Sequence, residues 1–121
     1  MKTPSLIILA LSLLSPLAAR AQTEQPHTVV HVVTVKWKPG TTPAQIEAAL
    51  EGVKQLPGKY AGIVHVWTKS IKVQGGKANA FVMEFADAAA LKAYTDSPAQ
   101  KDWYKIYLPI RGESTTFDIT N

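Results

Sequence analysis

The chain has 121 residues, no cysteine and a formal net charge of +4 at neutral pH. The length suits one domain, and without cysteine neither a disulfide framework nor a thiolate metal site is available, so packing of a core must stabilise the fold. The basic residues are scattered among apolar positions and form no run with interleaved aromatic residues. This pattern argues against nucleic-acid binding.

The first residues have the composition of an export signal. A basic start, an apolar stretch, a helix-breaking proline and a small-x-small cleavage site follow one another, here as Lys2, residues 6–14, Pro16, and Ala19 with Ala21. We therefore expect residues 1–21 to be a signal peptide and the exported protein, periplasmic or secreted, to begin at Gln22. The apolar stretch is shorter than the roughly 20 residues of a membrane span, so no stable membrane anchor is expected. An uncleaved amphipathic or membrane-anchoring helix is the alternative.

Residues 22–28 are polar, contain a proline and lack periodicity, which predicts a flexible leader. The segment VVHVVTVKW, residues 29–37, is rich in β-branched residues and predicts a first strand. Both of its alternating faces are too apolar for a strand with one side in water. We therefore expect both faces to be covered.

A helix is predicted to start at Thr42, because Pro43 suits the first helical position and Gln45 can complete a capping box. Apolar residues recur at helical spacing until Pro57–Gly58, where the helix is expected to end. Residues 62–73 and 78–86 then predict two strands that form a hairpin around Gly75–Gly76.

A second helix is predicted from Asp87, broken at Ser97–Pro98, with Ser97 and Gln100 repeating the capping box, and continuing to Pro109. Residues 113–120 alternate as a last strand. The order βαββαβ predicts an α+β domain over residues 29–121, a ferredoxin-like four-stranded antiparallel sheet with its helices on one face.

Helices on one face leave the other face of the sheet uncovered, although Val30, Val32 and Val82 make it apolar. Soluble monomers rarely expose such patches, and a self-complementary face suits a two-fold dimer. We therefore predict a homodimer through the sheet face. A monomer with exposed valines is the alternative.

Several segments together resemble a known family: HVVTVKWKPG at the start, FVMEFAD in the centre, ALKAYTDSPAQKDW in the second helix, and Asp118 in the last strand. In this order and spacing they resemble the stress-responsive A/B barrel domain proteins, which are dimeric α+β barrels. The resemblance implies a homodimer with a cavity between sheet and helices in each subunit. A plant polyketide cyclase is the best-known enzyme of this family.

The resemblance also implies which residues form the ligand-binding cavity wall: His31, Val33, Val35, Phe81, Met83, Tyr94, Gln100 and Trp103. In the cyclase, a tyrosine of this helix works with a histidine six residues later, which acts as the base. Tyr94 matches the tyrosine, but Gln100 stands at the histidine position. A glutamine amide has no basic lone pair, so we interpret Gln100 as a capping residue, and His31 and Tyr94 remain the candidate catalytic residues.

These observations predict an exported dimer that binds a small hydrophobic or aromatic molecule. The first alternative is a cofactor-free cyclase, isomerase or oxygenase that uses His31 and Tyr94. The second is a structural or interaction dimer whose core is filled by its own side chains. No metal or cofactor is expected, because His65 has no ligating neighbour in sequence and Gly75–Gly76 belongs to a hairpin rather than a phosphate loop.

Overall fold

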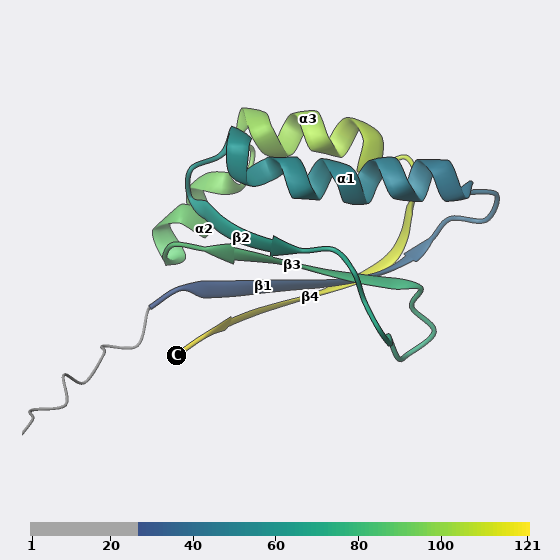
Figure 1. Ribbon diagram of the computed structural model, residues 1–121, viewed down its shortest axis with the longest axis horizontal. Helices are drawn as coiled ribbons and strands as arrows, with labels where there is room; N and C mark the ends of the chain where they lie inside the picture. Colours follow the sequence, from purple (N-terminus) through teal and green to yellow (C-terminus); the bar gives the residue numbers. More distant parts are fainter. Residues whose placement is uncertain (1–26) are drawn as a thin grey trace, which may run out of the picture.

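A computed structural model of the protein describes residues 27–121. The predicted signal peptide, residues 1–21, and most of the predicted leader lie outside the described residues. The elements follow the chain as β1 (Val29–Trp37), α1 (Pro43–Lys59), β2 (Ile63–Trp67), β3 (Asn79–Phe85), α2 (Ala88–Tyr94), α3 (Pro98–Tyr107) and β4 (Arg111–Thr120) (Figure 1). The predicted βαββαβ order is confirmed, with the second helix broken in two.

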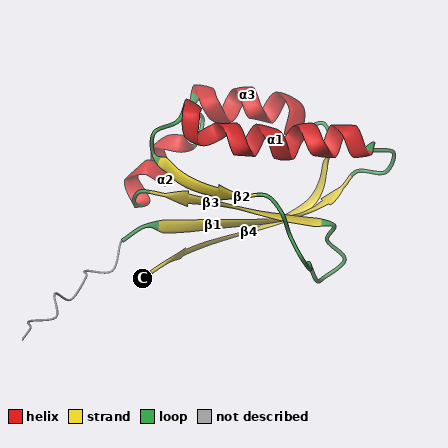
Figure 2. Ribbon diagram, in the orientation of Figure 1, coloured by secondary structure: helices red, strands yellow, loops and turns green. Residues whose placement is uncertain are grey.

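The strands form one antiparallel sheet in the order β2-β3-β1-β4. All three helices lie on one face of this sheet, as Figure 2 shows. The core between the two layers contains side chains from β1, β2, β3, all three helices and the turn before β4: Val29, Val33, Val35, Ala49, Val53, Leu56, Ile63, Phe81, Met83, Phe85, Tyr94, Ala99, Trp103, Tyr107 and Ile110. This is the ferredoxin-like arrangement that the sequence predicts.

The first helix begins as predicted but ends later. The Gln45 amide donates to Thr42 Oγ1 at 3.2 Å, and the Thr42 amide donates to Gln45 Oε1 at 2.9 Å, which completes the capping box. The predicted end at Pro57–Gly58 is wrong, since α1 runs to Lys59. Pro57 lies in the last turn, and the helix closes beyond it because the Tyr60 amide donates to the Leu56 carbonyl at 2.8 Å.

The strand predicted over residues 62–73 is shorter in the structure, where β2 ends at Trp67. A register shift between Ile63 and His65 bends this edge strand, and Ser70 Oγ then accepts the Ala80 amide at 3.4 Å, as a side chain rather than a backbone partner. The predicted hairpin between β2 and β3 is confirmed. Its long connection contains Gly75 and Gly76, both with positive φ.

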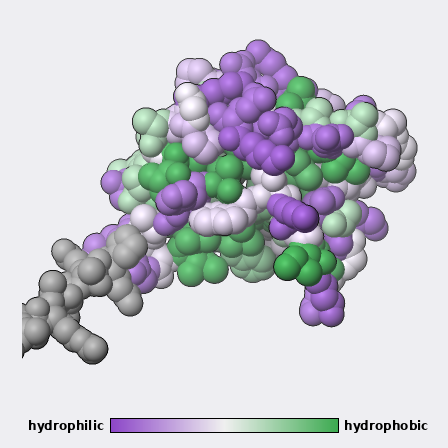
Figure 3. All heavy atoms as spheres, viewed as in Figure 1, coloured by the Kyte–Doolittle hydropathy of each residue, from purple (hydrophilic) through white to green (hydrophobic). Residues whose placement is uncertain are grey.

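The face of the sheet opposite the helices carries more apolar surface than the sequence analysis identified. Strand pairing places Trp67 beside Val82, Phe117 beside Val32 and Ile119 beside Val30. We call these six residues the open-face patch. Trp67, Phe117 and Ile119 are 53%, 53% and 57% exposed. In Figure 3 hydrophobic residues gather along the lower side of the molecule, below the sheet, while the outer surface of the helices is mainly hydrophilic.

Candidate functional site

A cavity of about 240 Å³ lies between the sheet and the helices. Seven of the eight residues predicted for the cavity wall line it: His31, Val33, Phe81, Met83, Tyr94, Gln100 and Trp103. The eighth, Val35, is fully buried in the core and is not among the lining residues. The structure adds a polar set that the sequence analysis did not name: Thr95, Tyr104, Tyr107, Arg111, Ser114 and Thr116.

The floor of the cavity follows the pairing of β1 with β4. His31 lies opposite Asp118, Val33 opposite Thr116, and Trp37 opposite Arg111. His31 and Arg111 therefore line the cavity from opposite ends of β1, and α2 and α3 supply the wall above the sheet.

At one end of the cavity, His31 forms a pair with Asp118. The distance between His31 Nδ1 and Asp118 Oδ1 is 2.5 Å, and the side chains are 18% and 48% exposed. The His31 ring also contacts the edge of Phe85, with centroids 6.0 Å apart. Since the carboxylate accepts from Nδ1, the pairing leaves Nε2 available to a ligand.

Two tyrosine hydroxyls are buried in the cavity wall. Tyr94 and Tyr107 are 2% and 3% exposed, and neither hydroxyl makes a hydrogen bond of good geometry within the described residues. Burial, with a contribution from Tyr104, raises the pKa of Tyr94 far above its ordinary value. Burial also raises the pKa of Tyr107, opposed by nearby Ser114 and Arg111. Both phenols therefore stay protonated at neutral pH.

Gln100 is buried, in contrast to Gln45 of the first helix, and it makes two side-chain hydrogen bonds. Its Oε1 accepts the Asp96 amide at 2.7 Å, and its Nε2 donates to the Tyr104 hydroxyl at 3.2 Å. The Ser97 hydroxyl accepts the Gln100 amide at 3.2 Å, as predicted. The reciprocal bond to Ser97 is absent because the Ser97 amide already donates to the Tyr94 carbonyl at 3.0 Å.

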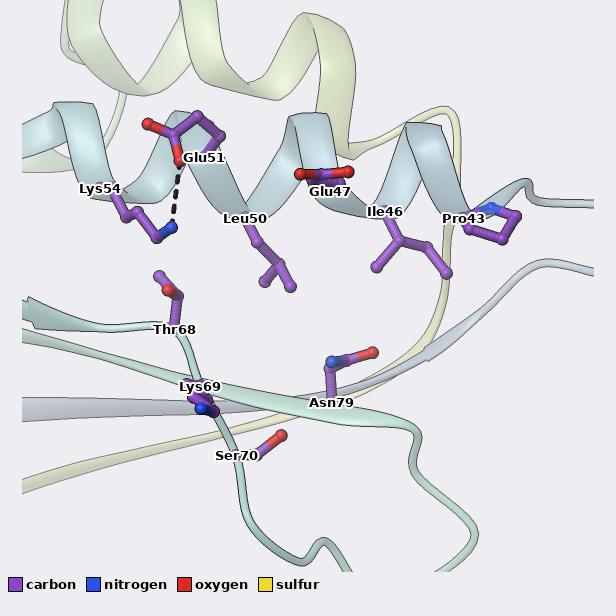
Figure 4. A pocket seen from close by; sticks show the side chains of 10 residues that line it. All are labelled: Pro43, Ile46, Glu47, Leu50, Glu51, Lys54, Thr68, Lys69, Ser70 and Asn79. Atoms are coloured by element: carbon purple, nitrogen blue, oxygen red, sulfur yellow. Dashed lines mark ion pairs between the residues drawn. The ribbon is translucent and has the colours of Figure 1, made fainter.

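A larger hollow of about 490 Å³ lies outside the core, between α1 and the segment after β2 (Figure 4). Ile46 and Leu50 point into it from the helix. Some of its polar side chains are paired with neighbours: Lys54 with Glu51 at 3.1 Å, and Asn79 Oδ1 with Trp37 Nε1 at 2.7 Å. The smaller cavity differs from this hollow because its wall contains the buried Tyr94 hydroxyl, which makes no hydrogen bond within the described residues.

Within residues 27–121, no group of three or more histidine or acidic side chains could hold a metal ion. None of the helices in this part of the chain is long and apolar enough to cross a membrane.

Sequence reasoning found the apolar wall but missed the partners of its polar residues. Alternation in residues 113–120 places Asp118 on the same face as Thr116 and Ser114, and that signal was present in the sequence. The pairing of Asp118 with His31 depends on the register between β1 and β4, which are far apart in the chain. Tyr104 follows Gln100 by four residues, a helical spacing that places both side chains on one face of α3, and this signal was also present in the sequence.

Comparison with solved structures supports the fold. The hydroxynitrile lyase from Passiflora edulis is similar with a TM-score of 0.70 and 16% identity, covering 79% of this chain and 94% of the lyase. A dimeric ferredoxin-like protein of unknown function from Thermobifida fusca is similar with a TM-score of 0.67 and 18% identity, covering 80% of this chain and 93% of that protein. A Dabb family protein from Mesorhizobium loti is similar with a TM-score of 0.65 and 22% identity, covering 78% of this chain and 96% of that protein.

Comparison with curated protein sequences gave no match. The stress responsive A/B barrel domain (Dabb) matches residues 29–121, which is the whole of the folded domain from the first residue of β1. The chain therefore belongs to the stress-responsive A/B barrel domain family.

Proposed function

We propose that the protein binds a small, mainly apolar molecule in the cavity between its sheet and helices. The observation that carries this proposal is the buried Tyr94 hydroxyl, which has no partner in the described part of the chain although it lines a cavity. A buried polar group without a hydrogen bond costs about 1–3 kcal/mol, so a ligand oxygen at this position would offset that cost.

The rest of the wall supports the same proposal. Val33, Phe81, Met83 and Trp103 offer apolar contact along the cavity. Ligand sites are usually mostly apolar with a few polar groups that fix orientation. The volume, about 240 Å³, lies just below the range of drug-sized ligands and suits a smaller molecule, such as a single substituted ring. It also argues against a core filled by its own side chains.

The proposed assembly is a homodimer through the open-face patch. Its two large aromatic residues, Trp67 and Phe117, are about half exposed. A second copy would bury the patch on both subunits at once, as a two-fold interface requires. The similar proteins from Thermobifida fusca and Bacteroides fragilis are described as dimeric, which is consistent with this proposal.

A thermal-shift screen of phenolic, aromatic-carboxylate and short fatty-acid compounds tests ligand binding. We expect a concentration-dependent rise in the melting temperature of the wild type, because a ligand that binds only the folded state stabilises it. Tyr94→Phe and His31→Ala should reduce the rise, whereas Gln45→Ala, which alters an exposed capping residue, should preserve it. A flat response to every compound would reject the proposal.

A second candidate function is proton transfer, which the His31–Asp118 pair supports. Nε2 of His31 would remove a proton from the carbon beside a carbonyl, and Tyr94 would donate a hydrogen bond to the oxygen on which negative charge develops. This is the chemistry of a cofactor-free isomerase or cyclase.

Exchange of the acetophenone methyl protons in D₂O, followed by NMR, tests this candidate. We expect the wild type to accelerate exchange, His31→Gln to abolish the acceleration, and Asp118→Asn to reduce it by about tenfold or more. Exchange no faster than in buffer would contradict proton transfer and leave binding as the function.

We also propose export, with removal of residues 1–21, on the basis of the N-terminal sequence. Intact mass of the protein isolated from periplasm and medium should correspond to a chain that begins at Gln22. A membrane-bound form that retains Met1 would overturn this proposal.

A further inference from the structure

The orientation of the Gln100 amide follows from its neighbours. The Asp96 amide is a donor without a lone pair, so the end of the glutamine that faces it at 2.7 Å must be the oxygen. The other end, which lies 3.2 Å from the Tyr104 hydroxyl, is therefore the NH₂ group. Since an NH₂ group only donates, the Tyr104 oxygen must accept this bond.

This bond determines whether the Tyr104 hydroxyl can act as a donor or as an acceptor toward a ligand. A hydroxyl that accepts from Gln100 still has its own hydrogen to donate. No acceptor for that hydrogen is found among the described residues, and Tyr104 lines the cavity. The Tyr104 hydrogen therefore has no protein acceptor and is available for donation to a ligand in the cavity.

Other polar groups of the cavity wall, on α2, α3 and β4, are donors as well. The hydroxyls of Tyr94 and Tyr107 are buried and have hydrogens to donate. Arg111, whose guanidinium carbon lies 5.8 Å from the centre of the Tyr107 ring, adds donors and positive charge at the far end. The two tyrosines and Arg111 thus give the cavity wall several hydrogen-bond donors.

We propose that Gln100 is a positioning residue that orients Tyr104 as a donor, so that the cavity selects ligands whose polar end is an oxygen acceptor, a carboxylate or a ketone. This inference rests on the proposed ligand binding and adds the ligand class. It also gives Gln100 a role beyond helix capping. Because a glutamine amide does not titrate, the donor polarity of Tyr104 does not change with pH on account of this residue.

Three probes of equal ring size test the wild type: benzoate, acetophenone and benzylamine, titrated by isothermal calorimetry at neutral pH. Benzoate and acetophenone present acceptors, and benzylammonium presents only donors. We expect both acceptor probes to bind at least tenfold more tightly than benzylamine. Equal affinity for all three probes would overturn the selection for acceptors while leaving the proposed binding intact.

Two variants then test whether Gln100 affects ligand affinity through Tyr104. Gln100→Glu keeps the shape and still accepts the Asp96 amide, but its second oxygen would accept the Tyr104 hydrogen and withdraw it from the cavity. We expect acetophenone, which is neutral and feels little charge repulsion, to lose at least threefold in affinity. Tyr104→Phe should lose about as much, and the double variant no more than either single variant.

The outcomes separate the two proposals. Gln45→Glu, at the exposed cap of α1, is the matched control and should leave all three affinities unchanged. Additive losses in the double variant, or an unchanged acetophenone affinity in Gln100→Glu, would show that Gln100 does not act through Tyr104. Failure of all three probes to bind the wild type at millimolar concentration would overturn both this inference and the proposed function.

Discussion

Tyr94 combines a buried ring with a hydroxyl that has no partner, and this combination has a measurable consequence for stability. Its ring packs against Phe85, with centroids 5.3 Å apart, and against Tyr60 at 5.4 Å. The ring therefore contributes to the core, while the hydroxyl opposes folding unless a ligand accepts its hydrogen. Stability and ligand binding should thus respond in opposite directions when this oxygen is removed.

We predict that Tyr94→Phe leaves the free energy of unfolding unchanged or raises it by up to about 1 kcal/mol at pH 7, because the ring stays and an unpaired buried hydroxyl is lost. Urea denaturation of the ligand-free protein measures this. A loss of more than about 1 kcal/mol would mean that the hydroxyl has a partner in the folded protein.

The same variant should change the response to alkaline pH. Burial raises the pKa of Tyr94 in the folded state, whereas the unfolded chain keeps the ordinary value of about 10. Above about pH 10 the unfolded state binds fewer protons, so the stability of the wild type falls as the pH rises. Tyr94→Phe should show a shallower fall between pH 10 and 12.

Gln100 and Gln45 both follow a capping residue by three positions, but they should differ in their contribution to stability. Gln45→Ala removes exposed hydrogen bonds and should cost no more than about 1 kcal/mol. Gln100→Ala leaves the Asp96 amide and the Tyr104 hydroxyl without their partner in a partly buried site. We predict a cost of about 1–3 kcal/mol in urea denaturation. Equal costs would support Gln100 as a capping residue only.

At the scale of elements, α1 and α3 approach each other at Gly52. A Cβ atom at this position would lie 2.7 Å from Trp103 Cδ1 and 3.1 Å from Ile106 Cδ1. Trp103 cannot easily yield, since its Nε1 donates to the Ala49 carbonyl at 2.9 Å and its ring stacks on Tyr107 with centroids 4.3 Å apart. This contact holds α3 over the cavity.

Gly52→Ala should therefore destabilise the protein by about 1–3 kcal/mol, although alanine is intrinsically the better helix former. Gly58→Ala is the matched control, because nothing lies within 4 Å of a Cβ atom there. We expect it to be neutral or to stabilise by up to about 1 kcal/mol. Thermal unfolding of both variants measures the difference, and stabilisation by Gly52→Ala would contradict the close packing of α1 and α3.

Elements with strong local signals could be predicted from the sequence, and elements that depend on distant partners could not. Thr42, Pro43 and Gln45 gave the start of α1 because capping is local. Strand β2 ends at Trp67 because its pairing with β3 stops there. The residues of β2 alone do not reveal where this pairing stops. The pairing of Asp118 with His31 likewise depends on the register between β1 and β4. The contact between Gln100 and Tyr104 is local, since the two residues are four apart on α3, and the sequence analysis missed it although the spacing was available.

At the scale of the whole molecule, the open-face patch is the proposed homodimer interface. Val32 lies at its centre, paired with Val82 on one side and Phe117 on the other. Val32→Asp would bury an unpaired charge between two sheets and should convert a dimer into monomers. Leu108→Asp, on the helix layer and 37% exposed, should leave the dimer intact. Sedimentation velocity at micromolar concentration distinguishes these states, and a monomeric wild type would contradict the proposed assembly.

The claim that a small molecule occupies the cavity between sheet and helices is tested most directly by methyl NMR during a benzoate titration. The methyl groups of Val33 and Met83 line this cavity, while those of Ile46 and Leu50 line the larger outer groove. We predict saturable shifts at Val33 and Met83, with Ile46 and Leu50 unchanged. Shifts confined to Ile46 and Leu50, or no saturable shift at Met83, would contradict the account.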